Sequence, residues 1–252
     1  MSNVITVDKL CKTYHMKGYD NEVLKNIDFT MEDGEFVSIM GPSGSGKSTL
    51  LYSVSGMDDI DSGTVSFADR EISSLKKKEL SKVRLTEMGF IFQQMYMLKK
   101  LCVFDNIVLP GYQAGNNRDA VNARAEQLMQ NLGIGDIANR EISEVSGGQL
   151  QRACICRALI NEPRVIFADE PTGALNSKSA GEVMQELRKI NRQGTGIMMV
   201  THSVKVAAQC DRVLYLVDGV IKGDVHLGKL EQDEDIPLRD QWLNNWLMNQ
   251  GW

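Results

Sequence analysis

The strongest constraint on the fold is an apolar segment that runs directly into a glycine-rich loop. Residues 35–40 (EFVSIM) have the composition of a buried strand, residues 41–49 (GPSGSGKST) follow without a gap, and an apolar helical run (LLYSV) comes next. Glycine permits backbone conformations that are closed to other residues, so several amide groups of such a loop can turn inward. The helix behind it adds the positive end of its dipole. This strand–loop–helix unit predicts an α/β fold with a phosphate-binding loop.

The loop also fits the spacing G-x-x-x-x-G-K-[ST]. At these positions the lysine reaches the β- and γ-phosphates of a nucleotide and the hydroxyl group coordinates Mg²⁺. Lys47 and Ser48 are the residues concerned. The alternative, a structural Gly/Ser-rich turn, does not account for the strand before it and the helix after it. The predicted nucleotide-binding residues of the loop are Gly41, Ser43, Gly44, Ser45, Gly46, Lys47, Ser48 and Thr49.

Two further apolar segments end in residues that suit phosphate chemistry. The run 165–168 (VIFA) leads into Asp169 and Glu170, and the run 196–201 leads into His202. Because ligands bind at the carboxyl ends of parallel strands, these residues are expected to gather at one edge of the sheet. Asp169 is predicted to hold Mg²⁺ through water, and Glu170 to act as general base. Two acids at a strand end are also common at solvated termini, so the phosphate loop is what makes them informative.

A second phosphate cradle is predicted where residues 145–149 (VSGGQ) precede a helix. Ser146 suits the N-cap of that helix, and Gly147 and Gly148 would bare backbone N–H groups at its start. A head-to-tail pair of chains would let this second cradle close on a nucleotide held by the first cradle of the partner. The sequence therefore predicts a homodimer with two composite sites, in which Ser146, Gly147, Gly148 and Gln149 bind the nucleotide in the partner.

The composition excludes several classes of protein. Hydrophobic residues make up 42% of the 252 residues and charged residues 24%, which is the balance of a globular protein. The net charge of −5 argues against a nucleic-acid-binding face. The longest apolar runs fall far short of the roughly 20 residues of a membrane span, and the first ten residues lack a signal-peptide pattern. The five cysteines are predicted to be free thiols of a reducing compartment, and the three histidines are too scattered for a zinc site.

The hydrophobic periodicity predicts an α/β core that a mostly helical segment interrupts at about 95–160. Residues 1–228 are expected to form one domain, and 229–252 a tail with a short amphipathic helix. In that helix Trp242 and Trp246 share a stripe with two leucines, which either packs on its own domain or docks on a partner. Strands are expected at 4–10, 23–31, 35–40, 63–67, 89–92, 165–168, 196–201 and, as a closing hairpin around Asp218 and Gly219, at 212–217 and 220–225, with helices at 121–132, 150–160 and 179–192.

The order of these motifs resembles that of ABC transporter ATP-binding subunits over residues 4–225. The resemblance implies a RecA-like P-loop NTPase core with an antiparallel β subdomain and an inserted α-helical subdomain. It also implies ATP and Mg²⁺ as cofactors, ATP hydrolysis, and a position on the cytoplasmic face of the membrane beside a separate permease. Gln93 would contact Mg²⁺ and the attacking water, His202 would sense the γ-phosphate, and Tyr14 would stack on adenine, although Tyr19 and His15 lie close by.

Three phrases, at 34–41, 89–93 and 167–175, resemble the branch of MacB-like macrolide exporters, LolD-like lipoprotein-releasing ATPases and BceA-like bacitracin and lantibiotic resistance ATPases. Residues 174–180 and 199–202 favour the antimicrobial-peptide group. The resemblance also implies that the segment from Gln94 to Leu98 receives a coupling helix of the permease, with packing in the core as the alternative. The chain departs from the family pattern at Val145, where the family more often has Leu, and at Asn176 and Ser203, where Asp is common. In the family the aspartate at the position of Asn176 lies at the dimer interface and helps to communicate the state of one site to the other.

Alternative functions remain open at this point. A MacB- or LolD-type ATPase, or an FtsE-like ATPase that transmits force or a signal to a membrane complex, would carry the same motifs. A soluble ABC ATPase that acts on ribosomes or DNA is the rival of a different class. Such proteins generally have two cassettes or long coiled-coil inserts, and this sequence shows neither feature.

Overall fold

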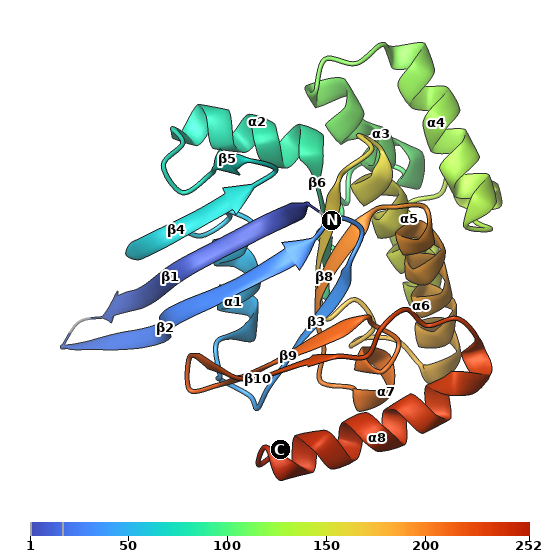
Figure 1. Cartoon of the computed structure of the whole chain (residues 1–252). Coiled ribbons are helices and arrows are strands. Elements are labelled where there is room, and N and C mark those ends of the chain that lie inside the picture. The colour runs from blue at the N-terminus through green and yellow to red at the C-terminus, as the bar shows by residue number, and fades with distance from the viewer. Residues whose placement is uncertain (1, 17) are drawn as a thin grey trace. The chain divides into compact units, whose positions relative to one another are not determined.

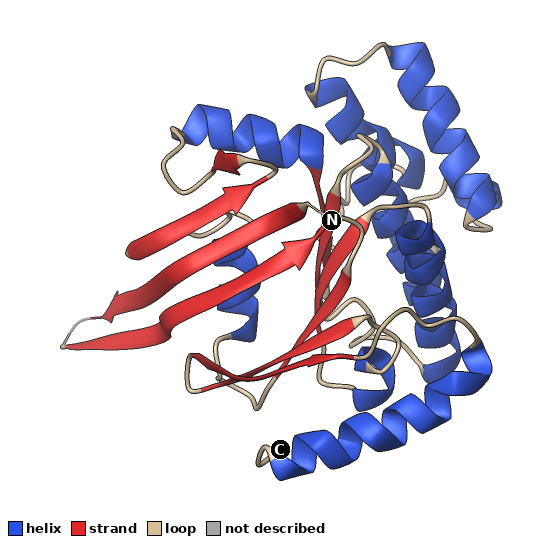
Figure 2. Ribbon diagram, viewed as in Figure 1, coloured by secondary structure: helices blue, strands red, loops and turns tan. Residues whose placement is uncertain are grey.

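The computed structural model describes residues 2–16 and 18–252, which form two compact units (Figure 1). Unit 1 comprises Met1–Leu80 and Gly196–Trp252, two stretches far apart in the sequence. Unit 2 is the continuous stretch Ser81–Thr195. Strands dominate the first stretch of unit 1, whereas helices dominate unit 2 (Figure 2). Among the described residues, no helix is both long and apolar enough to cross a lipid bilayer.

Unit 1 contains an antiparallel sheet in the strand order β2-β1-β4-β5. Its strands are β1 (Asn3–Met16), β2 (Tyr19–Glu32), β4 (Ser62–Phe67) and β5 (Arg70–Glu71). Buried and exposed residues alternate toward the end of β2, where Phe29 and Met31 face the core. This alternation is typical of a sheet with one covered face. It confirms the antiparallel β part of the predicted fold, with strands longer than the sequence pattern indicated.

The second group of strands in unit 1 surrounds β3 (Phe36–Met40). β3 pairs in parallel with both β8 (Gly196–Val200) and β9 (Arg212–Val217), and β10 (Val220–His226) pairs antiparallel with β9. All five residues of β3 are buried, as expected for a central parallel strand. The predicted hairpin is confirmed: Asp218 and Gly219 connect β9 to β10 with positive φ angles of 50° and 78°. Two helices follow strands of this group, α1 (Lys47–Val54) after β3 and α7 (Val204–Ala207) after β8.

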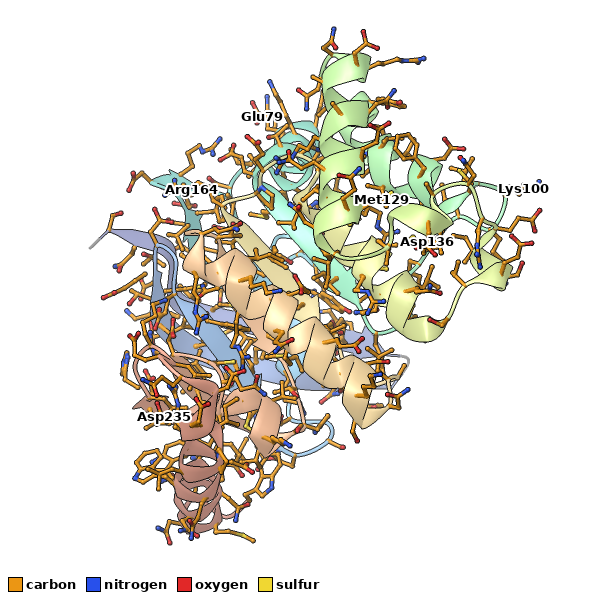
Figure 3. The ribbon with its side chains drawn as sticks, turned by 90° about the vertical axis from the view of Figure 1, so that its right-hand side faces the viewer. Glu79, Lys100, Met129, Asp136, Arg164 and Asp235 are labelled. Atoms are coloured by element: carbon orange, nitrogen blue, oxygen red, sulfur yellow. The ribbon has the colours of Figure 1, made fainter. Side chains whose placement is uncertain are left out.

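The tail folds back on unit 1 as α8 (Ile236–Asn249), which follows the 3₁₀ turn η3 (Asp233–Asp235). Pro237 lies in the first turn of this helix, where no helical hydrogen bond needs its missing N–H. Leu243 and Leu247 are fully buried in a cluster with Met40 and Tyr215. The leucine stripe thus packs on its own unit. Figure 1 shows α8 lying along the β9–β10 hairpin, and Figure 3 labels Asp235 at its start.

Unit 2 has two parallel strands, β6 (Met88–Phe92) and β7 (Val165–Asp169). α2 (Lys77–Glu87) leads from unit 1 into β6. The remaining helices are α3 (Val103–Gln113), α4 (Arg118–Asn131), α5 (Gly147–Leu159) and α6 (Ser177–Arg192), with 3₁₀ turns η1 (Gly135–Ile137) and η2 (Ile142–Glu144). α3, α4 and α5 pack on one another, which confirms an inserted helical subdomain in the predicted fold class.

The helical insert also contains elements that the sequence pattern did not predict. α3 continues through Pro110 and Gly111, two residues that usually end a helix. A tertiary contact accounts for the glycine: a Cβ atom at Gly111 would lie 2.7 Å from a methyl group of Val121, so the glycine allows α4 to approach closely. α2 is polar along most of its length, and Val83 is its one buried residue. It therefore lacks the apolar stripe by which a helix is recognised.

Candidate functional site

The phosphate loop, residues 41–49, connects the buried end of β3 to α1 in unit 1. Gly41 has φ 156°, and a Cβ atom at this position would collide with the carbonyl oxygen of Leu216. Gly46 has φ 100° at the N-cap of α1, and a Cβ atom there would lie 3.0 Å from the carbonyl oxygen of Val23. The fold therefore requires glycine at both positions. Both close contacts come from the backbone of neighbouring strands, since Leu216 belongs to β9 and Val23 to β2.

Lys47 is the first residue of α1 and is only 6% exposed. Its Nζ atom donates hydrogen bonds to the carbonyl oxygens of Gly41 and Pro42, at 3.0 and 2.8 Å. The hydroxyl of Ser45 is buried and has no hydrogen-bond partner among the described residues. A buried ammonium group, an unsatisfied hydroxyl and a helix N-terminus together suit an anion such as a phosphate group.

Tyr14 lies on β1, and two neighbouring side chains fix its ring. Its hydroxyl donates a hydrogen bond of 2.6 Å to Asp58, and the Nζ atom of Lys12 lies 5.0 Å from the ring centroid. By contrast, Tyr19 is 60% exposed, and His15 pairs with Asp20 on the surface of the sheet. Of the three candidates for a nucleobase platform, Tyr14 has the best-defined orientation.

His202 follows β8 on the exposed side of a short turn. The N–H of Ser203 donates to the Thr201 hydroxyl at 3.1 Å, which fixes the turn on either side of the histidine. β3 and β8 are parallel neighbours, with Ile39 opposite Val200. The phosphate loop and His202 therefore follow adjacent strands at the same edge of the sheet in unit 1, as the sequence predicts.

Unit 2 brings Gln93 and Glu170 together. β6 and β7 are parallel, with Phe92 opposite Asp169, so both residues directly follow paired strand ends. A Cβ atom at Gly173 would lie 3.0 Å from Oε2 of Glu170 and 3.1 Å from Nε2 of Gln93. Glu170 also has a φ angle of 46°, a left-handed conformation that non-glycine residues rarely adopt. Strain of this kind collects at functional sites, where the surrounding structure enforces it.

The second predicted phosphate cradle begins α5. Ser146 and Gln149 form a capping box, in which Gln149 N–H donates to the Ser146 hydroxyl at 3.3 Å and Ser146 N–H donates to the Gln149 side chain at 3.0 Å. Gly148 is buried, and a Cβ atom there would lie 2.9 Å from the Ser179 hydroxyl on α6. Ser146 and Gly147 are exposed. Unit 2 thus carries Gln93, Asp169, Glu170 and residues 145–149, whereas unit 1 carries Tyr14, the phosphate loop and His202.

A family model described as "ABC transporter" matches residues 24–173. This range contains the phosphate loop, Gln93, the helix start at residues 145–149, and both acids at the end of β7. The chain belongs to the ABC transporter family.

Among individual ABC proteins, the chain is 43% identical to the bacitracin export ATP-binding protein BceA of Halalkalibacterium halodurans over 226 residues, which cover 89% of both proteins. It is 40% identical to the lipoprotein-releasing system ATP-binding protein LolD of Aquifex aeolicus, over 89% of this chain and 99% of that protein. It is 47% identical to the macrolide export ATP-binding/permease protein MacB 1 of Aeromonas hydrophila over 81% of this chain, but that match spans only 31% of the relative. The predicted branch of the family is confirmed.

A solved ABC structure confirms the fold class. The dimeric structure of an ATP-binding cassette in a post-hydrolysis state, bound to ADP and Pi, superimposes with a TM-score of 0.83. The two chains are 36% identical, and the match covers 90% of this chain and all of the other.

Two departures from the ABC pattern keep a structural role. The side chain of Asn176 accepts the Ser179 N–H at 3.0 Å and begins α6. The hydroxyl of Ser203 accepts the Val206 N–H at 3.4 Å and begins α7. Asn, Ser and Asp are all good N-cap residues, so each substitution preserves the cap while it removes the charge of an aspartate.

Two residues of the ABC helical insert hold the segment after Gln93 in place. Arg157 on α5 donates to the carbonyl oxygens of Met95 and Tyr96, at 2.6 and 2.9 Å. Asn106 on α3 is 2% exposed and exchanges hydrogen bonds with both backbone groups of Leu98. The sequence did not predict these two residues, or Asp58 beside Tyr14, because none belongs to a local motif and the groups they bind, backbone groups or a single hydroxyl, carry no sequence signature.

Proposed function

We propose that this chain is the ATP-hydrolysing subunit of an ABC transporter and that it powers a separate membrane permease in resistance to antimicrobial peptides. The observation that carries this proposal is the 43% identity with BceA over 89% of both chains. A permease partner also places the chain on the cytoplasmic face of the membrane as a peripheral subunit. The test is to purify the chain with the permease that its neighbouring genes encode and to measure ATPase activity with bacitracin. Stimulation supports the proposal, and a complex that bacitracin leaves unstimulated argues against the peptide-resistance role.

A specific observation favours lipoprotein release as a second candidate. The chain matches LolD over 99% of the length of that protein. The two functions differ in the chemistry of the stimulating molecule, a soluble peptide in one case and an acylated protein in the other. The same ATPase measurement with a purified lipoprotein in detergent therefore separates them.

The residues at the ends of these strands would have different roles in ATP hydrolysis. The inward-facing amides of the phosphate loop and the buried Lys47 ammonium would hold the β- and γ-phosphates. Glu170 would accept a proton from the attacking water, and Gln93, whose amide approaches the same glycine, would orient that water. His202 would hydrogen-bond the γ-phosphate. Mg²⁺, when bound, neutralises charge that develops on the phosphates, and its predicted ligands are Ser48, Gln93 and, through water, Asp169.

The exposed start of α5 supports a head-to-tail homodimer. Ser146 and Gly147 are accessible at the N-terminus of a 13-residue helix, where backbone N–H groups favour an anion. In the proposed dimer, this helix start would face a nucleotide bound by the other chain. The solved relative that is bound to ADP and Pi is itself a dimer.

The segment from Gln94 to Leu98, here called the docking segment, is proposed to receive the permease. Its Tyr96 and Leu98 side chains are 61% and 50% exposed and stand two residues apart in the sequence. Met95 and Tyr96 both have positive φ angles, 59° and 45°, and Arg157 donates hydrogen bonds to their carbonyl oxygens. The segment thus exposes apolar side chains on a backbone that the helical insert holds by hydrogen bonds. Lys100, two residues beyond it, projects outward in Figure 3.

Leu98→Glu is expected to reduce co-purification with the permease at least tenfold, because an unpaired carboxylate buried in that interface costs several kcal/mol. Met97→Glu would be a poorer probe, since Met97 Sδ lies 3.3 Å from Arg157 and a carboxylate there would pair with it inside the chain. Leu238→Glu, at a position 70% exposed on α8, is the matched control. Normal permease recovery with the Leu98 variant would reject the docking role.

Asn176→Asp is expected to increase the rate of hydrolysis in the assembled complex without promoting closure of the dimer. The N-cap of α6 survives the change, so stability should hold or improve slightly. The added negative charge would tighten the geometry at the attacking water, but it would also face the polyphosphate of the partner. Turnover and ATP-driven dimerisation are to be measured side by side. If neither quantity changes, Asn176 has no role in communication between the two sites.

A further inference from the structure

Two side chains from different parts of unit 1, Lys12 and Asp58, contact Tyr14. The hydroxyl donates to Oδ2 of Asp58 at 2.6 Å. The other oxygen of the same carboxylate, Oδ1, accepts a hydrogen bond from Lys12 Nζ at 3.0 Å. Lys12 Nζ also donates to the carbonyl oxygen of Asp59 at 2.6 Å and lies 5.0 Å from the Tyr14 ring centroid. The carboxylate therefore joins the edge of the ring to the cation beside its face.

Asp58 connects this ring to the helix behind the phosphate loop. It follows the end of α1, and its backbone N–H donates to the carbonyl oxygen of Tyr52 on that helix at 3.1 Å. The side chains of Lys12 and Asp58 are 9% and 29% exposed, so the ion pair is largely shielded from solvent. A shielded pair is screened less by salt than a surface pair and holds a more definite geometry. The position of the ring is thereby tied to α1.

The charges of the cluster match this arrangement. Burial, followed by the hydrogen bond to Asp58, raises the pKa of the Tyr14 phenol, so the hydroxyl stays protonated and remains a donor at neutral pH. Burial acts to raise the pKa of the Asp58 carboxyl as well. The hydrogen bonds from Tyr14 and Lys12 outweigh burial and lower that pKa below its usual value. The acceptor is therefore ionised at the pH at which the donor is neutral.

We propose that Asp58, with Lys12 as its counter-ion, is a positioning residue that orients Tyr14 to stack one face of its ring on the adenine base of ATP. Lys12 occupies one face, so a base can stack only on the opposite face. This inference rests on the proposed function, because it takes ATP as the ligand. It adds a specific mechanical consequence: the base platform and the phosphate loop are fixed to the same helix, so the distance between base and phosphates is set in advance of binding.

The test compares ATP with inorganic tripolyphosphate, which has no base to stack. Affinities are measured by calorimetry without added Mg²⁺, so that no turnover occurs. Tyr14→Phe removes the hydroxyl and keeps the ring. Asp58→Asn leaves one carbonyl oxygen to serve two donors. Each change is expected to weaken the affinity for ATP about threefold to tenfold, the range of one hydrogen bond. The affinity for tripolyphosphate should stay within twofold of the parent value. The double variant should bind ATP about as tightly as whichever single variant binds it less well, because both changes break the same hydrogen bond.

Asp20→Asn is the matched control, since Asp20 is an exposed carboxylate of the same sheet that pairs with His15 at 2.8 Å. It should bind both ligands as the parent does. The inference is overturned if the Tyr14 and Asp58 variants bind ATP as the parent does, or if their affinities for ATP and tripolyphosphate fall equally. Should Asp58→Asn fail to fold in a thermal melt, Tyr14→Phe alone decides the question. A parent chain that binds neither ligand would instead overturn the proposed function.

Discussion

Glu170→Gln should lower ATP turnover at least about 100-fold while ATP binding persists. Glutamine keeps the size of the side chain and its position beside Gln93 and Gly173, but it cannot accept the proton of the attacking water. ATP should then hold two chains together in a stable dimer. Steady-state phosphate release measures the first effect, and size-exclusion chromatography with ATP measures the second. Turnover within twofold of the parent would remove Glu170 from the role of base.

Unit 2 offers a close control for this variant. Glu162 also has a left-handed backbone conformation, with φ 53° against 46° for Glu170. It is exposed and pairs with Arg124 at 2.8 Å, away from both strand ends. Glu162→Gln therefore tests the same chemical change on the same type of backbone. It should leave turnover unchanged, so that a loss confined to Glu170→Gln reports on chemistry and not on strain.

Lys47→Ala should instead weaken ATP binding at least about tenfold, the effect of losing a charged hydrogen-bond donor from a shielded site. The ammonium group bridges two loop carbonyl oxygens, which would lose their donor as well. The affinity for tripolyphosphate should fall to the same extent as the affinity for ATP, because the lysine contacts phosphates and not the base. This shared loss distinguishes Lys47 from Tyr14, whose variants should affect ATP alone.

Lys222→Ala on β10 is the corresponding control, because Lys222 is exposed on the same unit. It removes an equal charge without reaching the phosphate loop. An unchanged ATP dissociation constant for Lys47→Ala, measured by the same titration, would contradict the assignment of the loop.

The sequence predicted best where local chemistry and backbone geometry coincide. The run from β3 through Gly41 and Gly46 to Lys47 determines its own structure, since glycines, strand and helix start are consecutive. The hairpin at Asp218 and Gly219 is a similar case. Pairing of parallel strands then placed His202 beside the loop strand and Gln93 beside Glu170, because the carboxyl ends of such strands share an edge.

The features that escaped prediction depend on contacts distant in sequence. α3 runs through Pro110 because neighbouring helices hold it, and nothing within its own residues signals that support. Arg157 donates hydrogen bonds to carbonyl oxygens 61 and 62 residues earlier in the sequence, and Asp58 accepts one from a hydroxyl 44 residues earlier. Backbone carbonyls carry no sequence signature, so their partners can be recognised only once the chain is folded.

The packing of Met40 against Leu243 and Leu247 has a consequence for biosynthesis. Unit 1 is discontinuous, and the strand that carries the phosphate loop emerges from the ribosome about 200 residues before the helix that covers it. At roughly 5–20 residues per second, that interval is about 10–40 s. Unit 2 is continuous and can fold during that interval, whereas Met40 lacks its contacts with Leu243 and Leu247 until α8 has been made. Throughout that interval the nascent chain exposes the part of Met40 that α8 later covers.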